Sequence, residues 1–147
     1  PAGPTGATGA TGPQGPIGPA GPQGSADSIF ASSGASTIEA GVTAPLTLTT
    51  ATPDSSMSVS ANAVTLTEDG YYLVSFFLTG NNASSYSLEN NGTTVATLSD
   101  TSAGTDTTTQ SQTVLINASA GDTLTLVNTG TDSIAVTSTG ITVLKVA

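Results

Sequence analysis

The sequence predicts an all-β sandwich or barrel that follows a triple-helical tract. Glycine occupies every third position from Gly3 to Gly24 without a break. Beyond Gly24, short apolar and Ser/Thr-rich runs are separated by Gly, Asn, Asp and Pro about every 8–12 residues, the spacing of sandwiches and barrels. These runs show no helical periodicity. We divide the chain into a Gly-X-Y tract (1–24), a junction (25–28) and a β head (29–147).

The tract has the repeat of a collagen triple helix, because only glycine fits where three polyproline-type chains meet. Proline never stands directly before a glycine, where animal collagens carry hydroxyproline, and this favours a bacterial or phage origin. We expect so short a tract to be triple-helical only with help from the head, and a disordered Gly/Pro linker is the alternative. Thr5, Thr8 and Thr11 would face solvent, as candidate O-glycan acceptors or as simple solvated side chains.

The first strands of the head are short and are marked by alternation and by turn residues. We predict strands at 28–31 and 36–39 around Gly34, at 46–49 after Pro45, at 57–59, and at 63–67, where Val64 and Leu66 point inward. The Glu68-Asp69-Gly70 turn then leads into the longest apolar run of the head, at 71–79.

The second half of the head continues the same pattern. Strands at 86–89 and 93–98 flank Asn91-Gly92, and Asn-Gly is the strongest two-residue hairpin signal. Further strands are predicted at 109–117, 123–128, 133–136 and 141–146, with Ala120-Gly121-Asp122 as a turn.

Two of the predicted strands, 71–79 and 141–146, are apolar on both faces. A sandwich strand with one wet face should alternate cleanly, so the second apolar face predicts burial against another surface. For a head attached to a triple helix that surface is the two sister chains. The alternatives are a strand wholly internal to the monomer, or scattered surface hydrophobic residues. The residues expected in the trimer interface or the core are Tyr72, Leu73, Val74, Phe76, Phe77, Leu78, Ile141, Val143, Leu144 and Val146.

The composition excludes several classes of function. The chain has no cysteine, histidine or arginine, so we expect no enzyme, no cofactor and no cysteine- or histidine-ligated metal. The net charge of −9 argues against nucleic-acid partners, and no apolar run approaches the length of a membrane span, so no membrane insertion is expected.

A few polar residues have two interpretations each. Asp100, Asp106, Asp122 and Asp132 are candidate calcium ligands or simple turn formers. The only lysine, Lys145, is either an edge charge that blocks strand addition or a lysine paired with a carboxylate. Asn82, Asn91 and Asn117 head Asn-X-Ser/Thr glycosylation patterns, which we expect to be inert in a bacterial protein.

Four segments in order carry a family resemblance: residues 68–76 (EDGYYLVSF), 87–92 (SLENNG), 120–126 (AGDTLTL) and 141–147 (ITVLKVA). Their set resembles the C1q/TNF-like jelly roll. With the Gly-X-Y tract and the opening Ile29-Phe30-Ala31, the chain is similar to the BclA-type collagen-like glycoproteins of bacterial spore surfaces. The resemblance implies a homotrimeric ten-stranded jelly-roll β-sandwich at the tip of a filament on the exosporium, in an extracellular location.

We therefore expect a structural protein, in which the head drives homotrimer formation and sets the register of the stalk. The first alternative is an adhesin that binds a host-surface, matrix or glycan ligand through loops 50–57, 99–108 and 129–133. The second alternative is the receptor-binding tip of a phage tail fibre.

Overall fold

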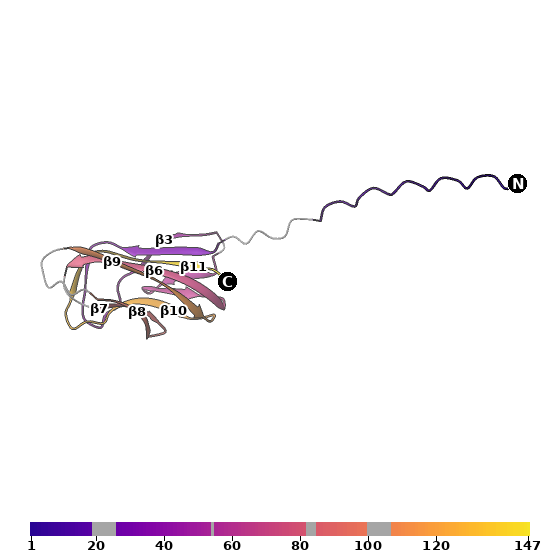
Figure 1. The fold of residues 1–147 in the computed structure, drawn as a ribbon. Coiled ribbons are helices and arrows are strands. Elements are labelled where there is room, and N and C mark those ends of the chain that lie inside the picture. The colour runs from indigo at the N-terminus through magenta and orange to yellow at the C-terminus, as the bar shows by residue number, and fades with distance from the viewer. Residues whose placement is uncertain (19–25, 54, 82–84, 100–106) are drawn as a thin grey trace.

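The computed structural model describes residues 1–18, 26–53, 55–81, 85–99 and 107–147. Within these ranges the head is all-β, with eleven strands in two antiparallel sheets that face each other (Figure 1). The all-β sandwich prediction is therefore confirmed. Residues 1–18 contain no helix or strand and extend away from one end of the sandwich.

Sheet A is the larger of the two sheets and joins the first and last strands of the head. Its order is β3-β1-β11-β6-β9, and β2 also pairs with β11. Its strands are β1 (Ser28–Ser33), β2 (Ser36–Ile38), β3 (Thr47–Ala51), β6 (Gly70–Asn81), β9 (Thr108–Ala118) and β11 (Ile134–Lys145). Because β1 pairs with the end of β11, the junction to the tract and the C-terminus lie at the same end of the sandwich.

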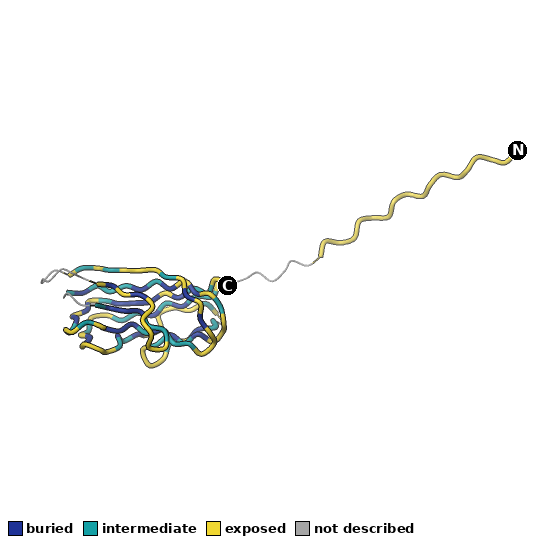
Figure 2. The backbone as a smooth tube through the Cα atoms, turned by 60° about the horizontal axis from the view of Figure 1, so that its bottom comes forward, coloured by how far each residue is buried: buried dark blue, intermediate teal, exposed yellow. Residues whose placement is uncertain are grey.

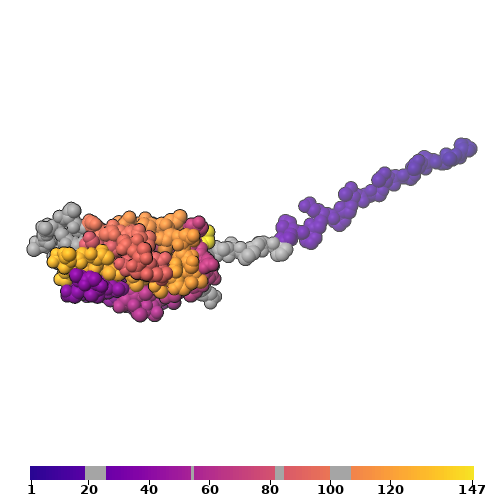
Figure 3. Space-filling view, turned by 90° about the horizontal axis from the view of Figure 1, so that it is seen from below, coloured from indigo at the N-terminus to yellow at the C-terminus, as the bar shows by residue number. Residues whose placement is uncertain are grey.

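Sheet B has the order β4-β5-β10-β7-β8. Its strands are β4 (Met57–Ser60), β5 (Ala63–Leu66), β7 (Ser85–Asn90), β8 (Thr93–Ser99) and β10 (Thr123–Asn128). Figure 3 shows the molecule from the sheet B side, where β7 and β8 lie near the middle of the face. The chain therefore crosses between the sheets repeatedly, from β3 to β4, at each end of β6 and of β9, and from β10 to β11, as it does in a jelly roll.

The core fills the space between the sheets, and the buried stretches of the strands face one another there (Figure 2). Sheet A contributes Tyr72, Val74 and Phe76 from β6, and the long apolar side chains of β10 and β7 face them from sheet B. Burial of this apolar surface is the main favourable term in folding such a domain.

One strand prediction is wrong in its boundaries. The segments predicted at 133–136 and 141–146 form a single strand, β11, whose pairing with β6 shifts register between Val136 and Ser138. The polar run between them suggested a loop. The ladder continues through it because a β-bulge absorbs one extra residue without ending the strand.

Two hairpin turns have left-handed backbone at two successive residues. Asn91 and Gly92 have φ of 49° and 77°, the conformation that an Asn-Gly hairpin requires. Ala61 and Asn62, between β4 and β5, adopt φ of 49° and 64°. Sequence reasoning did not find this second hairpin turn, because alanine is not a residue that favours a left-handed conformation.

A buried hydrogen bond joins the two sheets through the core. The Tyr86 hydroxyl of β7 lies 2.7 Å from the Thr139 Oγ1 of β11, and that Oγ1 donates to the Phe77 carbonyl over 2.8 Å. Since Thr139 uses its proton on the carbonyl, Tyr86 is the donor between the two hydroxyls. Its hydroxyl stays protonated, because burial raises the pKa of Tyr86.

Replacing Tyr86 by phenylalanine is expected to cost about 1 kcal/mol of unfolding free energy, because it removes this bond without changing the packed ring. Chemical denaturation of the single variants Tyr86→Phe and Thr139→Val and of the double variant measures the coupling. We expect the double variant to lose less than the sum of the singles. Strictly additive losses would show that the two hydroxyls do not interact.

Candidate functional site

The outward face of sheet A, which we call the assembly face, carries an apolar row next to the tract. Leu144 of β11 is the register partner of Leu73 of β6, and Leu73 is the partner of Leu115 of β9. These three residues form the leucine row. Leu73 is 37% exposed and Leu115 is 60% exposed, so the row meets solvent in the single chain. Exposed apolar surface gathered in this way is typical of an interaction site.

The leucine row lies at the end of the sandwich where the tract joins the head. Ser28, the first residue of β1, is the register partner of Leu144. Tyr71, on the same face of β6 as Leu73, adds to this apolar surface and is 48% exposed. Val146, which follows β11, is also half exposed. The apolar part of the assembly face is therefore the part nearest to the Gly-X-Y tract.

Farther from the junction, two pairs of hydroxyl groups lie on the assembly face, one on either side of Phe77. Ser75 of β6 hydrogen-bonds Thr113 of β9 over 2.7 Å. Thr79 and Thr109 repeat the contact over 2.8 Å. In each pair the two hydroxyl groups satisfy each other's hydrogen-bonding capacity across the strands. This part of the face therefore presents paired, uncharged groups to a partner or to water.

Charge is distributed unevenly over the fold. The strands of sheet A contain no aspartate or glutamate, and Lys145 is their only charged residue, although the chain carries ten carboxylates. Charged residues are depleted in the centres of protein interfaces, because burying an unpaired charge is costly. Copies of this acidic chain can thus meet through sheet A without mutual repulsion at the contact.

The structure places the ten predicted interface or core residues in two groups. Tyr72, Val74, Phe76, Ile141 and Val143 point into the core between the sheets, and Leu78 packs partly buried against that core. Leu73, Phe77 and Leu144 lie on the assembly face, and Val146 is exposed beyond the end of β11. Leu115 joins them in space and was missed by sequence reasoning.

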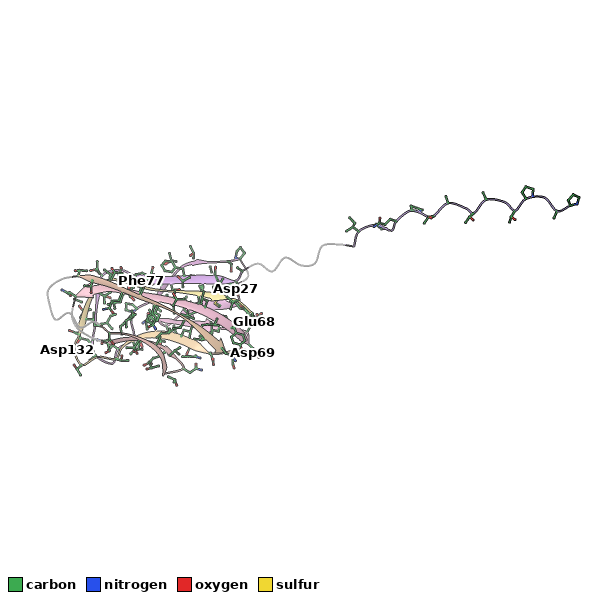
Figure 4. All side chains as sticks on the ribbon, viewed as in Figure 1. Asp27, Glu68, Asp69, Phe77 and Asp132 are labelled. Atoms are coloured by element: carbon green, nitrogen blue, oxygen red, sulfur yellow. The ribbon has the colours of Figure 1, made fainter. Side chains whose placement is uncertain are left out.

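Phe77 has a specific place on the assembly face. A Cβ at Gly140, its register partner, would lie 2.7 Å from the Phe77 ring and 3.1 Å from the Ala31 carbonyl oxygen. The ring therefore covers the glycine of the neighbouring strand, in the sheet A layer seen in Figure 4. This contact explains the glycine in the middle of β11, where glycine by itself weakens a strand.

The junction is anchored by a hydrogen-bonded carboxylate. Asp27 accepts bonds from Thr52 Oγ1 (3.0 Å), Ser55 Oγ (2.6 Å), and the backbone N–H of Ser56 (2.8 Å) and its hydroxyl. We call these four residues the neck cluster. They tie the loop after β3 to the start of β1, so the chain enters the head at a fixed point (Figure 4).

The neck cluster also changes the acidity of its carboxylate. Burial alone would raise the pKa of Asp27, but the hydrogen bonds from Ser55, Ser56 and Thr52 outweigh it and hold that pKa below its ordinary value. The cluster therefore stabilises the fold only while Asp27 is ionised.

We expect the neck cluster to contribute stability above the unfolded-state pKa of about 4, and to lose it as the pH falls through the lower folded-state pKa. The measurement is the thermal midpoint of the native chain and of Asp27→Asn between neutral and strongly acidic pH. The native chain should be the more stable at pH 7, and the two curves should converge in acid. A difference that stays constant with pH would contradict the role of the charge.

Lys145 is paired with a carboxylate. Its Nζ contacts Oε2 of Glu68, and this contact raises the pKa of Lys145. β11 lies between β1 and β6, so Lys145 does not protect a sheet edge. The C-terminal residue packs nearby, because the Ala147 carbonyl accepts the Tyr71 N–H over 2.7 Å and a Cβ on Gly70 would lie 2.2 Å from that carbonyl oxygen.

The candidate calcium ligands do not converge within the described residues. Asp122 accepts bonds from Asn90 and Asn91 and lies near Asp69, which accepts the Ala120 N–H. Asp132 lies at the opposite end of the sandwich from Asp69 (Figure 4). Asp100 and Asp106 fall outside the described residues. In the part of the chain that the structure describes, no three Asp or Glu side chains are grouped as a metal site.

The loops proposed for ligand binding belong to different ends of the head. Loop 50–57 is fixed at the tract end by the neck cluster. Loop 129–133 lies at the far end, where Asp132 is placed (Figure 4). Most of loop 99–108 is outside the described residues, as is Asn82. Loops 50–57 and 129–133 therefore do not form one contact surface.

Asn128 organises the far end of the sandwich, a role that has no local signal in the sequence. Its side chain is fully buried at 0% exposure. Its Nδ2 donates to the carbonyls of Ile38 (2.9 Å) and Asp132 (2.7 Å), and its Oδ1 accepts the Gly130 N–H (3.0 Å). One amide thus joins the end of β2 to the loop after β10.

The comparisons with known proteins bear on the fold. Family models and curated protein sequences give no match to this chain. Among solved structures, the chain is similar to Eiger TNF from S. frugiperda, with a TM-score of 0.68 and 18% identity over 82% of this chain and 94% of that one. Murine APRIL at pH 5.0 gives a TM-score of 0.67 and 9% identity, covering 83% of this chain and 100% of that one.

GITRL from pika is also similar, with a TM-score of 0.57 and 21% identity over 82% of this chain and 97% of that one. These likenesses and the two-sheet topology define the head as a TNF-like jelly roll, a fold that usually forms homotrimers. The described residues contain no helix with the length and apolarity of a membrane span.

Proposed function

We propose that the chain is the trimerising head of a collagen-like surface filament, with the end of its stalk attached. The observation that carries the proposal is the leucine row, an exposed apolar row on an acid-free sheet, at the end where the Gly-X-Y tract joins the head. A triple helix formed by the repeat in the tract takes three parallel chains. Two further copies of this chain are the occupants of the assembly face that fit both features.

In this function the head works by raising local concentration. Identical Gly-X-Y triplets can pair in many registers, so the stalk alone has no preferred alignment. Three heads held together at the leucine row bring the three tracts to a common start, because the neck cluster fixes where each chain leaves its head. The high effective concentration of tethered ends then favours the aligned triple helix.

The location proposed for this filament is the exosporium of a bacterial spore. The support is the sequence resemblance to BclA-type glycoproteins together with a tract that does not depend on prolyl hydroxylation. Thr5, Thr8 and Thr11 are exposed in the tract and are the proposed O-glycan acceptors. The proposed role is structural and requires no catalysis by the head.

A glycan or host-surface ligand is the second candidate function, and one observation favours it. The buried amide of Asn128 holds loop 129–133 in place at the end away from the stalk, where a filament tip would meet its surroundings. Rigidly held loops at such positions commonly carry binding. A glycan array probed with the intact chain tests this role, and the absence of any reproducible hit would refute it.

The test of the first proposal is removal of residues 29–147. Circular dichroism of the remaining tract should lack the triple-helical signal that the full chain shows on cooling. Fusion of the tract to an unrelated trimeric coiled coil should restore the signal, since any trimerising domain supplies the same local concentration. A stable triple helix in the isolated tract would show that the head is not the organiser.

A further inference from the structure

The Asn91-Gly92 turn contains the pair of residues most prone to a spontaneous covalent change. In an Asn-Gly pair the glycine backbone nitrogen can reach the asparagine Cγ, because glycine places no side chain in the way. Asn91 is exposed at the tip of the β7–β8 hairpin, so water reaches it. The sequence alone therefore marks Asn91 as chemically labile.

Both polar atoms of the Asn91 side chain form hydrogen bonds in the folded head. Its Nδ2 donates to Asp122 Oδ1 over 2.7 Å, and its Oδ1 accepts the Thr123 N–H over 3.0 Å and the Thr123 hydroxyl over 3.2 Å. Its backbone N–H donates to the Thr123 carbonyl over 3.0 Å. We call Asn91, Asp122 and Thr123 the hairpin clasp.

The clasp is supported from a second side. Asp122 Oδ2 accepts Asn90 Nδ2 and the Ser119 N–H, each over 3.0 Å. These bonds and that of Asn91 lower the pKa of Asp122, so the acceptor is an anion at neutral pH and its hydrogen bonds are the stronger charged kind. The side chain of Asn91 must break its hydrogen bonds to Asp122 and Thr123 before its Cγ can come within reach of the Gly92 backbone nitrogen.

We propose that Asn91 is a deamidation site that the hairpin clasp keeps closed in the folded head. In the reaction the Gly92 backbone nitrogen forms a bond to Asn91 Cγ, the bond from Cγ to Nδ2 breaks, and ammonia leaves with the proton from Gly92. Water then opens the resulting succinimide to aspartate or isoaspartate. No oxidant, reductant or cofactor takes part.

Deamidation of Asn91 disrupts the hairpin clasp itself. The product replaces a donating amide by a carboxylate that faces Asp122, so a hydrogen bond becomes a contact between like charges. An isoaspartate also adds one backbone atom to a two-residue turn whose geometry sets the hairpin register. Deamidation therefore leaves the clasp open, since the modified hairpin does not close again in the native way.

The same contact bears on the glycosylation pattern that begins at Asn91. The atom that a glycan would occupy is Nδ2, and in the folded head that atom is donated to Asp122. Both modifications of Asn91 thus require an open clasp. Asn117, on the exposed side of β9, has no such constraint among the hydrogen bonds described above.

The experiment follows deamidation of the purified full chain at 37 °C and mildly alkaline pH by mass spectrometry of the chymotryptic peptide that contains Asn91. We expect the native chain to react slowly, and the variant Asp122→Ala to react about tenfold faster or more, because it removes the acceptor that closes the clasp. The native chain unfolded in urea gives the deamidation rate in the absence of the clasp. This rate should be at least as high as that of Asp122→Ala.

Tyr86→Phe serves as the matched control, since it weakens the core without touching the clasp. Its Asn91 should react at the native rate, which separates local opening from global unfolding. Asp122→Asn keeps an acceptor oxygen, and its rate should lie between those of the native chain and Asp122→Ala. The proposal is overturned if the native chain reacts as fast as the unfolded chain, if Tyr86→Phe accelerates the reaction as much as Asp122→Ala, or if the modified residue is not Asn91.

Discussion

Leu73→Asp is expected to convert the proposed trimer of heads into folded monomers. Leu73 stands in the centre of the leucine row and is partly exposed, so the substitution leaves the monomer core intact. In a trimer it would bury a carboxylate against apolar neighbours in each of three subunits, at several kcal/mol for each uncompensated charge. Sedimentation velocity measures the loss of the trimer, and far-ultraviolet circular dichroism confirms that the β fold remains.

The matched control for this variant is Val42→Asp. Val42 is 47% exposed, so it is at least as accessible as Leu73, and its backbone contacts β10 of sheet B instead of sheet A. This variant should remain trimeric and keep the triple-helical signal of the tract, while Leu73→Asp loses both. Equal behaviour of the two variants would mean that the assembly face is not the contact.

Asn128→Asp should be the most destabilising near-isosteric change in the head. The replacement fits the same space, but it turns an amide that donates to two carbonyls into a carboxylate that faces them in a fully buried site. Losing both donors and burying a charge should cost about 3–5 kcal/mol. Urea denaturation at pH 7 gives the loss directly.

The same variant has a pH dependence of defined sign. A buried carboxylate without a cation has its pKa raised above the unfolded-state value. The variant therefore regains stability as the pH falls and the group takes up a proton, and loses it as the pH rises. Asn117→Asp, at an exposed position of β9, is the control and should change little. A loss that did not depend on pH would contradict the buried charge as its cause.

The strand order of the head could be predicted only in part from the sequence. Alternation and turn residues identified every strand, because the period of two and the Asn-Gly signal are local properties. The division of 133–146 into two strands was wrong, because a bulge preserves a ladder through a polar stretch that has no apolar alternation. Pairing between β1 and β11 depends on contacts across nearly the whole head and has no local signal.

The residues of the candidate site could also be predicted only in part from the sequence. Apolar residues on both faces of β6 and β11 indicated an outer contact, and Leu73 and Leu144 do lie on the assembly face. Leu115 was not expected there, because its place in the row depends on the register between β6 and β9. Asp27 and Asn128 each gather partners from distant segments, and a single aspartate or asparagine in a Ser/Thr-rich chain carries no mark of that role.

The central claim is that the head, and not the Gly-X-Y tract, holds the three chains together. The most direct measurement is the mass in solution of residues 26–147 without the tract, by sedimentation equilibrium over a range of concentrations. The leucine row and the acid-free sheet A predict a particle of three chains. A folded particle of one chain at every concentration would contradict the claim, and would make the tract the organiser of any trimer.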